Sequence, residues 1–297
     1  MDWSATAKTA FDPAKVEGAI AFFKALPQPI RPPQETLEAY RELVARNSPA
    51  PVLVLGATPE LIDLALDLGS DRVVSMDWNA DTFEAMRRTA RNDWQRVDFV
   101  HQEWTSPKPE FAGQFGSVLC DGGAMFLPSE QWEDVSSHVH AYLRPGGLWI
   151  ARCMDGQGET EADFESTVRA DLAAFDGSAK ADEIAYRRLA LHLRISTFRE
   201  VADRDGNLDQ ALFAARNDLA ADLMQQAFAD GSAQKAADQL LRTLLRPSSG
   251  PSMMKSAAGP DVTVPALKRV GFACTQCRLS GDNDHTGIFY LTIAERI

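Results

Sequence analysis

Apolar and polar residues alternate along this chain in a pattern that changes from one region to the next. From Pro51 onward, short apolar runs alternate with segments in which apolar residues recur at helical spacing. The apolar runs are VLVL, RVVSMD, VDFVHQ, SVLCDG and LWIARCM, and the helical segments are Pro59 to Leu68, Ala80 to Arg91 and a stretch around Trp132 to Tyr142. Strands that alternate with helices predict a parallel sheet with helices on both faces.

Local signals at the ends of two helices support this pattern. Thr58 suits the N-cap of the first helix, and Pro59 suits its first position because proline has no amide hydrogen to lose there. Pro145, Gly146 and Gly147 end the later helix and turn the chain into the last parallel strand. The turn after the first strand is therefore expected to begin a helix directly.

The flanking regions complete the predicted architecture. Residues 1–50 contain two helical segments around the proline-rich PQPIRPP and are expected to form a helical cap before the core of 51–154. Residues 155–260 contain amphipathic helices, one of them expected to begin at an Asn207 cap with Gln210 at its third position. Residues 261–297 contain a helix and two strands, CTQCRLS and IFYLTIAER. We therefore expect an α/β, Rossmann-like fold whose seven-stranded sheet is mostly parallel with an antiparallel last strand, with helices on both faces and a large helical insertion before the last two strands.

Composition narrows the functional class. The chain has 297 residues, of which 45% are hydrophobic, so it can bury a substantial core. Its 30 basic and 42 acidic residues give a net charge of -12, which disfavours binding to a phosphate backbone. The N-terminal MDWSATAKTAFD lacks the features of a secretion signal, and no apolar run approaches the roughly 20 residues of a membrane helix. We expect a cytoplasmic enzyme without nucleic-acid or membrane partners, and its oligomeric state stays open.

The four cysteines do not indicate a metal site. Cys274 and Cys277 have the spacing of a redox or zinc-ligand pair, but zinc usually needs two further ligands. The sequence has no second CxxC motif and no paired histidine cluster. Cys274 and Cys277 would also face opposite sides of an extended strand. We therefore expect structural cysteines and no metal.

The segments PVLVLGATPE and VVSMDWNADTFEAM have the outline of a nucleotide-binding βαβ unit. Gly56 follows the first apolar run, where a ligand must approach the backbone closely. Asp77 ends the second run about twenty residues later, where a carboxylate can bind both hydroxyls of a ribose. The sequence therefore predicts a ribose-containing ligand.

The order VLVLGATPE, VVSMDWN, VHQEW, SVLCDGG and LRPGGLWIAR resembles the class I S-adenosylmethionine-dependent methyltransferases. The resemblance covers Pro51 to Met154 well and the last thirty residues loosely, and the insertion carries no recognisable motif. The GATPEL variant, with its RPPQETLEAY lead-in, is similar to a bacterial subgroup of these enzymes. The resemblance implies S-adenosyl-L-methionine as cofactor and S-adenosyl-L-homocysteine as product.

The resemblance assigns roles at the first two strands. Gly56, Ala57 and Thr58 would line the methionine part of the cofactor, with amides at the helix start facing its carboxylate. Asp77 would bind the ribose hydroxyls, and Trp78 would cover one face of the adenine.

The resemblance also assigns roles at the third and fourth strands. Glu103 would lie near the adenine amino group, with Trp104 beside it. Asp121 and Gly122 would lie next to the sulfonium and the methyl group.

The chain departs from the family pattern in the glycine-rich turn. Val54 stands where these enzymes commonly have an acidic residue, and Thr58 and Glu60 replace later glycines. A usual contact to the cofactor's ammonium is therefore missing. Either Asp121 or Glu60 can supply the negative charge, and we favour Asp121 because Glu60 also suits the positive end of its helix.

Candidate residues for the acceptor are less well defined. Arg152 lies in an otherwise apolar strand, where an arginine needs an anionic partner, either a substrate carboxylate or an internal acid. Arg31 and Tyr40 in the N-terminal cap are further candidates for substrate binding. His285 in the GDNDH turn, or Asp121, would act as base if the acceptor arrives protonated.

We expect methyl transfer by in-line displacement to a small-molecule acceptor, of a carboxylate-bearing or amino-acid-like kind, with N-, S- and O-methylation all open. The insertion would close over the acceptor. A non-catalytic or regulatory homologue that binds the cofactor is one alternative, because Val54 replaces the usual acid. A nicotinamide-dependent oxidoreductase is another, although GATPE lacks the G-x-G-x-x-G turn. Protein or peptide acceptors are a third.

Overall fold

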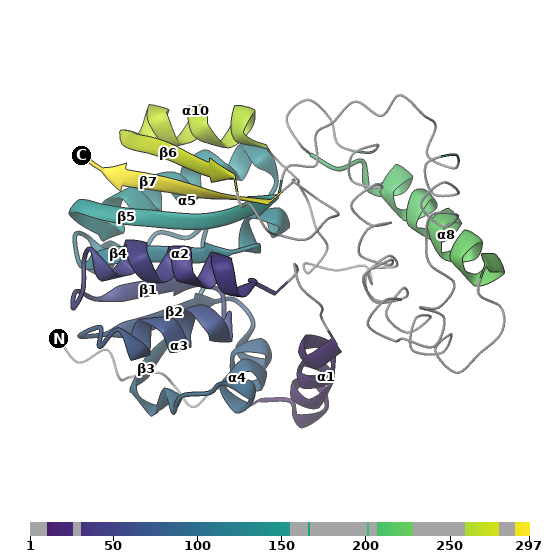
Figure 1. The fold of residues 1–297 in the computed structure, drawn as a ribbon, viewed down its shortest axis with the longest axis horizontal. Helices are drawn as coiled ribbons and strands as arrows, with labels where there is room; N and C mark the ends of the chain where they lie inside the picture. Colours follow the sequence, from purple (N-terminus) through teal and green to yellow (C-terminus); the bar gives the residue numbers. More distant parts are fainter. Residues whose placement is uncertain are drawn as a thin grey trace.

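A computed structural model describes residues 11–25, 31–154, 166, 201, 207–227, 259–278 and 289–297. The core is a seven-stranded sheet with the strand order β3-β2-β1-β4-β5-β7-β6 (Figure 1). The strands are β1 (Val52–Leu55), β2 (Val73–Asp77), β3 (Val97–His101), β4 (Phe115–Asp121), β5 (Leu143–Met154), β6 (Phe272–Arg278) and β7 (Phe289–Arg296). Neighbouring strands among β1 to β5 pair in parallel, whereas β7 is antiparallel to both β5 and β6. The predicted Rossmann-like fold with a mostly parallel, seven-stranded sheet is confirmed.

Helices cover both faces of the sheet. Their bounds are α1 (Pro13–Ala25), α2 (Gln34–Ala45), α3 (Pro59–Asp67), α4 (Ala80–Thr89), α5 (Trp132–Tyr142) and α10 (Pro260–Val270). Strand β1 shows how the two faces separate, because its side chains alternate between two apolar clusters. Leu53 and Leu55 pack with residues of α5 and α10, and Val52 and Val54 pack with residues of α1 to α4. All four β1 residues are buried, as expected for a central parallel strand.

The turn between β1 and α3 places the start of a helix directly above the sheet edge. Thr58 occupies the N-cap position and Pro59 begins the helix, as predicted. The Thr58 side chain makes no capping hydrogen bond. Backbone N–H groups of Leu61 and Ile62 donate to the Thr58 carbonyl, which holds the first turn of α3.

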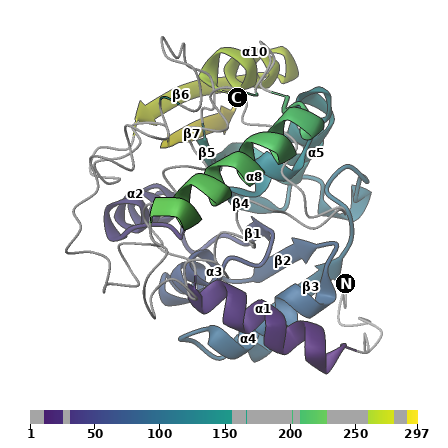
Figure 2. The same cartoon turned by 90° about the vertical axis from the view of Figure 1, so that its right-hand side faces the viewer.

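Helix α8 (Gln210–Ala227) lies in the chain between β5 and β6. Figure 1 shows it beyond the carboxyl ends of the parallel strands, and Figure 2, viewed from that side, shows it crossing in front of the sheet. Just before α8, Asn207 Oδ1 accepts a hydrogen bond from the Ser129 amide at 2.8 Å. This contact joins the segment before α8 to the chain that follows β4.

The predicted Asn207 cap of this helix was wrong. The helix begins two residues later than expected, and Asp209 Oδ1 accepts a hydrogen bond from the Leu212 amide at 2.9 Å. Asparagine and aspartate both cap helices well, so the sequence offers two acceptors two residues apart. Asn207 is instead engaged by Ser129, which is distant in the sequence.

Within the described ranges, no helix is long and apolar enough to cross a membrane.

Candidate functional site at the carboxyl edge of the sheet

Gly56 forms the turn at the carboxyl end of β1. Its φ of +99° lies in the region that favours glycine. Its amide donates to the Met76 carbonyl at 2.8 Å, and its carbonyl accepts from the buried Ser75 hydroxyl at 2.8 Å. Two bonds to β2 therefore fix the backbone at the position where the sequence predicts close approach of a ligand.

Asp77 ends β2 beside this turn. A Cβ atom placed on Gly56 would lie 3.9 Å from Asp77 Oδ2, so the carboxylate lies directly beside the glycine. Asp77 is only 9% exposed, and its Oδ1 accepts from the Asn79 amide at 2.8 Å. Burial raises the pKa of Asp77 to about 6, and the nearby Glu103 carboxylate also raises it.

The indole of Trp104 lies against the same turn. Its Nε1 donates to the Met76 carbonyl at 2.8 Å, and a Cβ on Gly56 would lie 3.6 Å from the ring. A Cβ on Gly123, after β4, would overlap the same ring. The indole thus covers the space between the ends of β1 and β4, and a ligand seated on the Gly56 turn contacts it.

The remaining residues predicted for the cofactor lie on the same edge of the sheet. Trp78 and Glu103 are exposed after β2 and β3, and Ala57 is buried after Gly56. Gly122 has a φ of +65°, and its amide donates to the Arg152 carbonyl at 3.1 Å.

Asp121 at the end of β4 forms a buried ion pair with Arg152 on β5. Arg152 Nε donates to Oδ1 at 2.6 Å and Nη2 donates to Oδ2 at 3.2 Å. The two side chains are 4% and 1% exposed. The Arg152 guanidinium also lies over the Phe289 ring, 4.8 Å from its centroid. Of the two partners considered for Arg152, the structure contains the internal acid.

Burial raises the pKa of Asp121, while the charge and hydrogen bonds of Arg152 act to lower it. Tyr40 from α2 packs against this pair. Its hydroxyl donates to the Cys120 carbonyl at 2.8 Å and accepts from the Arg152 amide at 3.0 Å. Burial raises the pKa of Tyr40 well above its ordinary value, so the hydroxyl stays protonated. Both of its bonds are internal, and the side chain is fully buried.

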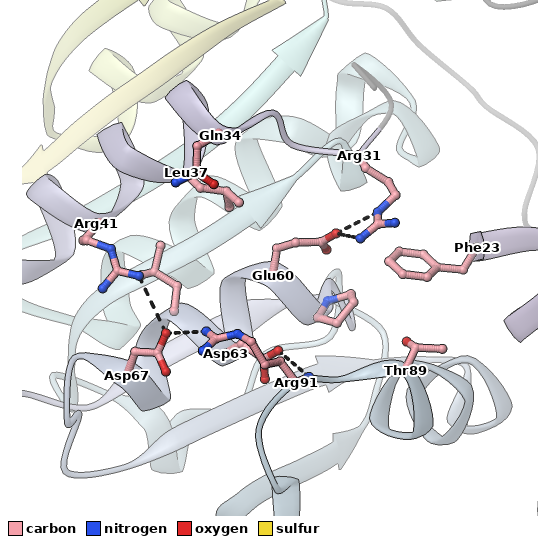
Figure 3. Close-up of a pocket in the computed structure, with 12 residues that line it drawn as sticks. Phe23, Arg31, Gln34, Leu37, Arg41, Glu60, Asp63, Asp67, Thr89 and Arg91 are labelled. Carbon is pink, nitrogen blue, oxygen red and sulfur yellow. Dashed lines mark hydrogen bonds and ion pairs between the residues drawn. The ribbon is translucent and has the colours of Figure 1, made fainter. Parts of the chain in front are cut away.

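Arg31 pairs with Glu60 at the start of α3 (Figure 3). Arg31 Nε and Nη2 both donate to Glu60 Oε1, at 2.8 and 2.5 Å. The other carboxylate oxygen, Oε2, is buried and has no hydrogen-bond partner in the part of the chain that the structure describes. The Arg31 guanidinium lies 4.5 Å from the centroid of the Phe23 ring.

A cavity of about 460 Å³ lies beside α3, bounded by residues of α1, α2 and the end of α4 (Figure 3). It meets the predicted site at Pro59 and Glu60 but does not include Gly56 or Asp77. Its arginines and acids are paired with one another, as in the Arg91 and Arg41 contacts to Asp67. The lining residues are Phe23, Arg31, Gln34, Leu37, Arg41, Pro59, Glu60, Asp63, Leu64, Asp67, Thr89 and Arg91.

The structure brings together the residues predicted from four strand ends and adds two that sequence reasoning missed. Ser75 anchors the Gly56 carbonyl, and Gly123 leaves room for the Trp104 ring. Gly123 adjoins the predicted Gly122, so the double glycine was its only signal. His285, predicted as a base, lies outside the described residues.

Comparison with known proteins assigns the core. Residues 54–147 match the sequence profile of the methyltransferase domain family. This segment of the chain is similar to methyltransferase domains. It runs from within β1 to within β5. No curated protein matches the chain by sequence.

Solved structures are similar to this chain at low sequence identity. A protein from Rhodobacter sphaeroides assigned as a Zn-dependent alcohol dehydrogenase is 17% identical, with 96% of this chain and 99% of that chain covered and a TM-score of 0.54. The CMeT domain of the citrinin polyketide synthase is 13% identical, with 96% and 57% covered and a TM-score of 0.50. An O-methyltransferase family protein from Burkholderia thailandensis is 14% identical, with 90% and 57% covered and a TM-score of 0.49. At these identities the likeness concerns the fold alone.

The residues at this edge of the sheet would fit S-adenosyl-L-methionine at three points. Asp77 offers a buried carboxylate oxygen beside Gly56, suited to the ribose hydroxyls. Gly56 presents no side chain to the ligand, and the Trp104 indole offers an aromatic surface to the adenosine.

Proposed function

We propose that this protein transfers a methyl group from S-adenosyl-L-methionine to a small-molecule acceptor by in-line displacement. The observation that carries the proposal is the pairing of Gly56 and Asp77 at the carboxyl edge of a parallel sheet, within a segment similar to methyltransferase domains. Open α/β sheets bind ligands at this edge. The net charge of -12 argues against a nucleic-acid acceptor, and α8 across this edge supports an enclosed small molecule (Figure 2).

The bound cofactor supplies a methyl group made electrophilic by its sulfonium. In this proposal the protein acts mainly by positioning, which can contribute about 7 to 11 kcal/mol when the reacting atoms are aligned. Asp77 binds the ribose, Gly56 allows close approach, and the Trp104 ring limits where the adenosine can lie. The rigid bonds from β2 to the Gly56 turn keep this geometry fixed.

The residues near Asp121 define the acceptor side of the proposal. Both Asp121 oxygens accept bonds from Arg152, so we assign this pair to shaping the pocket floor and leave proton removal, where an acceptor needs it, to His285 or water. A carboxylate-bearing acceptor would have to use Arg152 N–H groups other than the two that bond Asp121, or displace Asp121. The Tyr40 hydroxyl holds the Arg152 backbone in place by accepting a hydrogen bond from its amide.

Calorimetry on the purified protein tests the proposal. We expect S-adenosyl-L-homocysteine to bind and NAD and NADP not to bind. A thermal-shift screen of metabolites with the homocysteine product present would then reveal acceptors, because a ligand that binds the closed complex raises the melting temperature. Turnover is measured with the acceptors so identified.

Each outcome of these measurements has a distinct meaning. Dinucleotide binding without S-adenosyl-L-homocysteine binding would replace the proposal with an oxidoreductase. Cofactor binding without turnover on small molecules or peptides would indicate a non-catalytic homologue. Turnover on peptides alone would refute the small-molecule acceptor.

A further inference from the structure

Strand β1 has no acidic side chain to receive the ammonium group of the cofactor. Val54 is fully buried and packs in the apolar cluster on the side of α1 to α4. S-Adenosyl-L-methionine nevertheless carries an α-ammonium group on its methionine part. This group loses bonds to water when it is bound, so it needs an acceptor in the protein.

Carboxylates near the Gly56 turn include Glu103, Asp77, Asp121 and Glu60, of which Glu103 is exposed to solvent. Asp77 and Asp121 have other roles. Asp77 faces Gly56 and suits the ribose. Asp121 has both oxygens bonded to Arg152, which neutralises its charge. Glu60, four residues after Gly56, uses only one of its oxygens.

The second carboxylate oxygen of Glu60 is buried in a way that lowers the stability of the folded protein. Oε2 is buried and accepts no hydrogen bond within the described ranges of the chain. A buried carboxylate oxygen without a donor loses its hydration and gains nothing in return. A hydrogen-bond donor that reaches Oε2 would remove this cost.

Arg31 fixes the direction in which Oε2 can act. Its Nε and Nη2 both bond Oε1, and the Phe23 ring lies against the guanidinium (Figure 3). The carboxylate therefore cannot turn freely. The Glu60 carboxylate also raises the pKa of Asp121, so its charge acts at the end of β4 as well as at the start of α3.

We propose that Glu60 Oε2 accepts a hydrogen bond from the α-ammonium of the cofactor's methionine part, with Arg31 as the positioning residue that holds Oε1. This assignment rests on the proposed function and replaces the sequence-based preference for Asp121. The contact adds a second cationic donor to a carboxylate whose other oxygen already pairs with Arg31, and hydrogen bonds to charged groups are strong.

The test compares two ligands on the Glu60→Gln variant. S-Adenosyl-L-homocysteine carries the amino-acid part, whereas 5′-methylthioadenosine lacks it and keeps the adenosyl sulfur. Calorimetry should show that Glu60→Gln weakens S-adenosyl-L-homocysteine binding by about 10-fold to 100-fold, the usual worth of a hydrogen bond to a charged group. Binding of 5′-methylthioadenosine should stay at the wild-type affinity. Arg31→Met should give a smaller loss with the same ligand dependence.

Glu35→Gln is the matched control, because it makes the same change on an exposed residue of α2 and should leave both affinities unchanged. A deaminated analogue of S-adenosyl-L-homocysteine, tested on the wild-type protein, needs no variant and should bind as weakly as the product binds Glu60→Gln. Equal loss for both ligands in a folded Glu60→Gln, or no loss for either, would overturn the assignment of Glu60. Wild-type protein that binds neither ligand would overturn the proposed function and the Glu60 contact with it.

Discussion

At the scale of single residues, Asp77 shows that a site can cost stability. Its carboxylate is buried at the end of β2, close to the Glu103 carboxylate, and its pKa rises from 3.8 to about 6. The folded state then holds its proton more tightly than the unfolded state does. Above pH 6 the ionised group therefore lowers the free energy of unfolding, and this penalty disappears as pH falls toward 3.8.

Replacement of Asp77 by Asn should separate stability from binding. Asp77→Asn removes the buried charge, and the new side-chain oxygen can still accept a hydrogen bond from the Asn79 amide. We therefore expect the free energy of unfolding to rise by about 1 to 3 kcal/mol at neutral pH. Urea denaturation would measure it. Cofactor affinity should fall by at least about tenfold, because a bond to a charged group is lost.

The pH dependence provides the control for this variant. The stability advantage of Asp77→Asn should shrink as pH is lowered from 6 to 3.8, since the wild-type carboxyl then takes up its proton. If Asp77→Asn remained more stable than the wild type by the same amount at low pH, the gain would have another cause. Unchanged S-adenosyl-L-homocysteine binding would remove Asp77 from the ribose site.

The residue scale also marks a limit of prediction from sequence. Asp77 was predictable because the strand spacing from Gly56 fixes its place. The bond between Arg31 and Glu60 was not, because Arg31 lies within the proline-rich PQPIRPP, which has no helix or strand periodicity to fix its place relative to α3. Each of the two residues was noticed separately in the sequence, but nothing there indicated their contact.

At the scale of elements, the ion pair between Asp121 and Arg152 joins neighbouring strands at the site. Asp121 and Arg152 are register partners on β4 and β5, and Tyr40 from α2 bonds the backbone of both strands. Three elements therefore meet at one buried polar cluster. The sequence indicated that Arg152 needs an anion, but could not choose between Asp121 and a substrate.

Removing one member of this ion pair should lower the free energy of unfolding more than removing both members. Arg152→Met leaves the Asp121 charge buried without its guanidinium, and we expect a loss of about 3 to 5 kcal/mol in the free energy of unfolding. The double variant Arg152→Met with Asp121→Leu should recover much of that loss. Chemical denaturation of the three proteins measures the difference. Equal instability of the single and double variants would contradict this account.

Gly123 tests the packing of the Trp104 ring between elements. A Cβ at this position would overlap the indole, so Gly123→Ala should cost about 1 to 3 kcal/mol. Most of the added cost should disappear in a Trp104→Ala background, where the ring is absent and Cys120 Sγ, at 3.0 Å, remains close to the added carbon. Gly18→Ala in α1 is the control, because no atom lies within 4 Å of the added carbon, and helix propensity predicts a gain of up to about 1 kcal/mol. Additive costs for Gly123→Ala and Trp104→Ala would refute the contact.

At the scale of the whole molecule, the periodic pattern of the sequence was sufficient to predict the sheet. Apolar runs marked β1, β2, β4 and β5 because central parallel strands are buried on both faces, as the two clusters on either side of the sheet show. The edge strand β3 is only partly buried, but its run was long enough to be recognised. The details that depend on distant contacts escaped prediction. Asn207 was expected to cap α8 but bonds Ser129, and Trp104 turned toward Gly56 and Gly123 rather than standing beside Glu103 alone.

The place of β7 in the sheet has a consequence for biosynthesis. This strand comes last among the described strands, yet it is inserted between β5 and β6. While the ribosome is still making the intervening chain, β5 presents an edge of unpaired backbone N–H and C=O groups to other nascent proteins. Until β7 emerges, the growing polypeptide is vulnerable to aggregation, and chaperones are best placed to protect it during that interval.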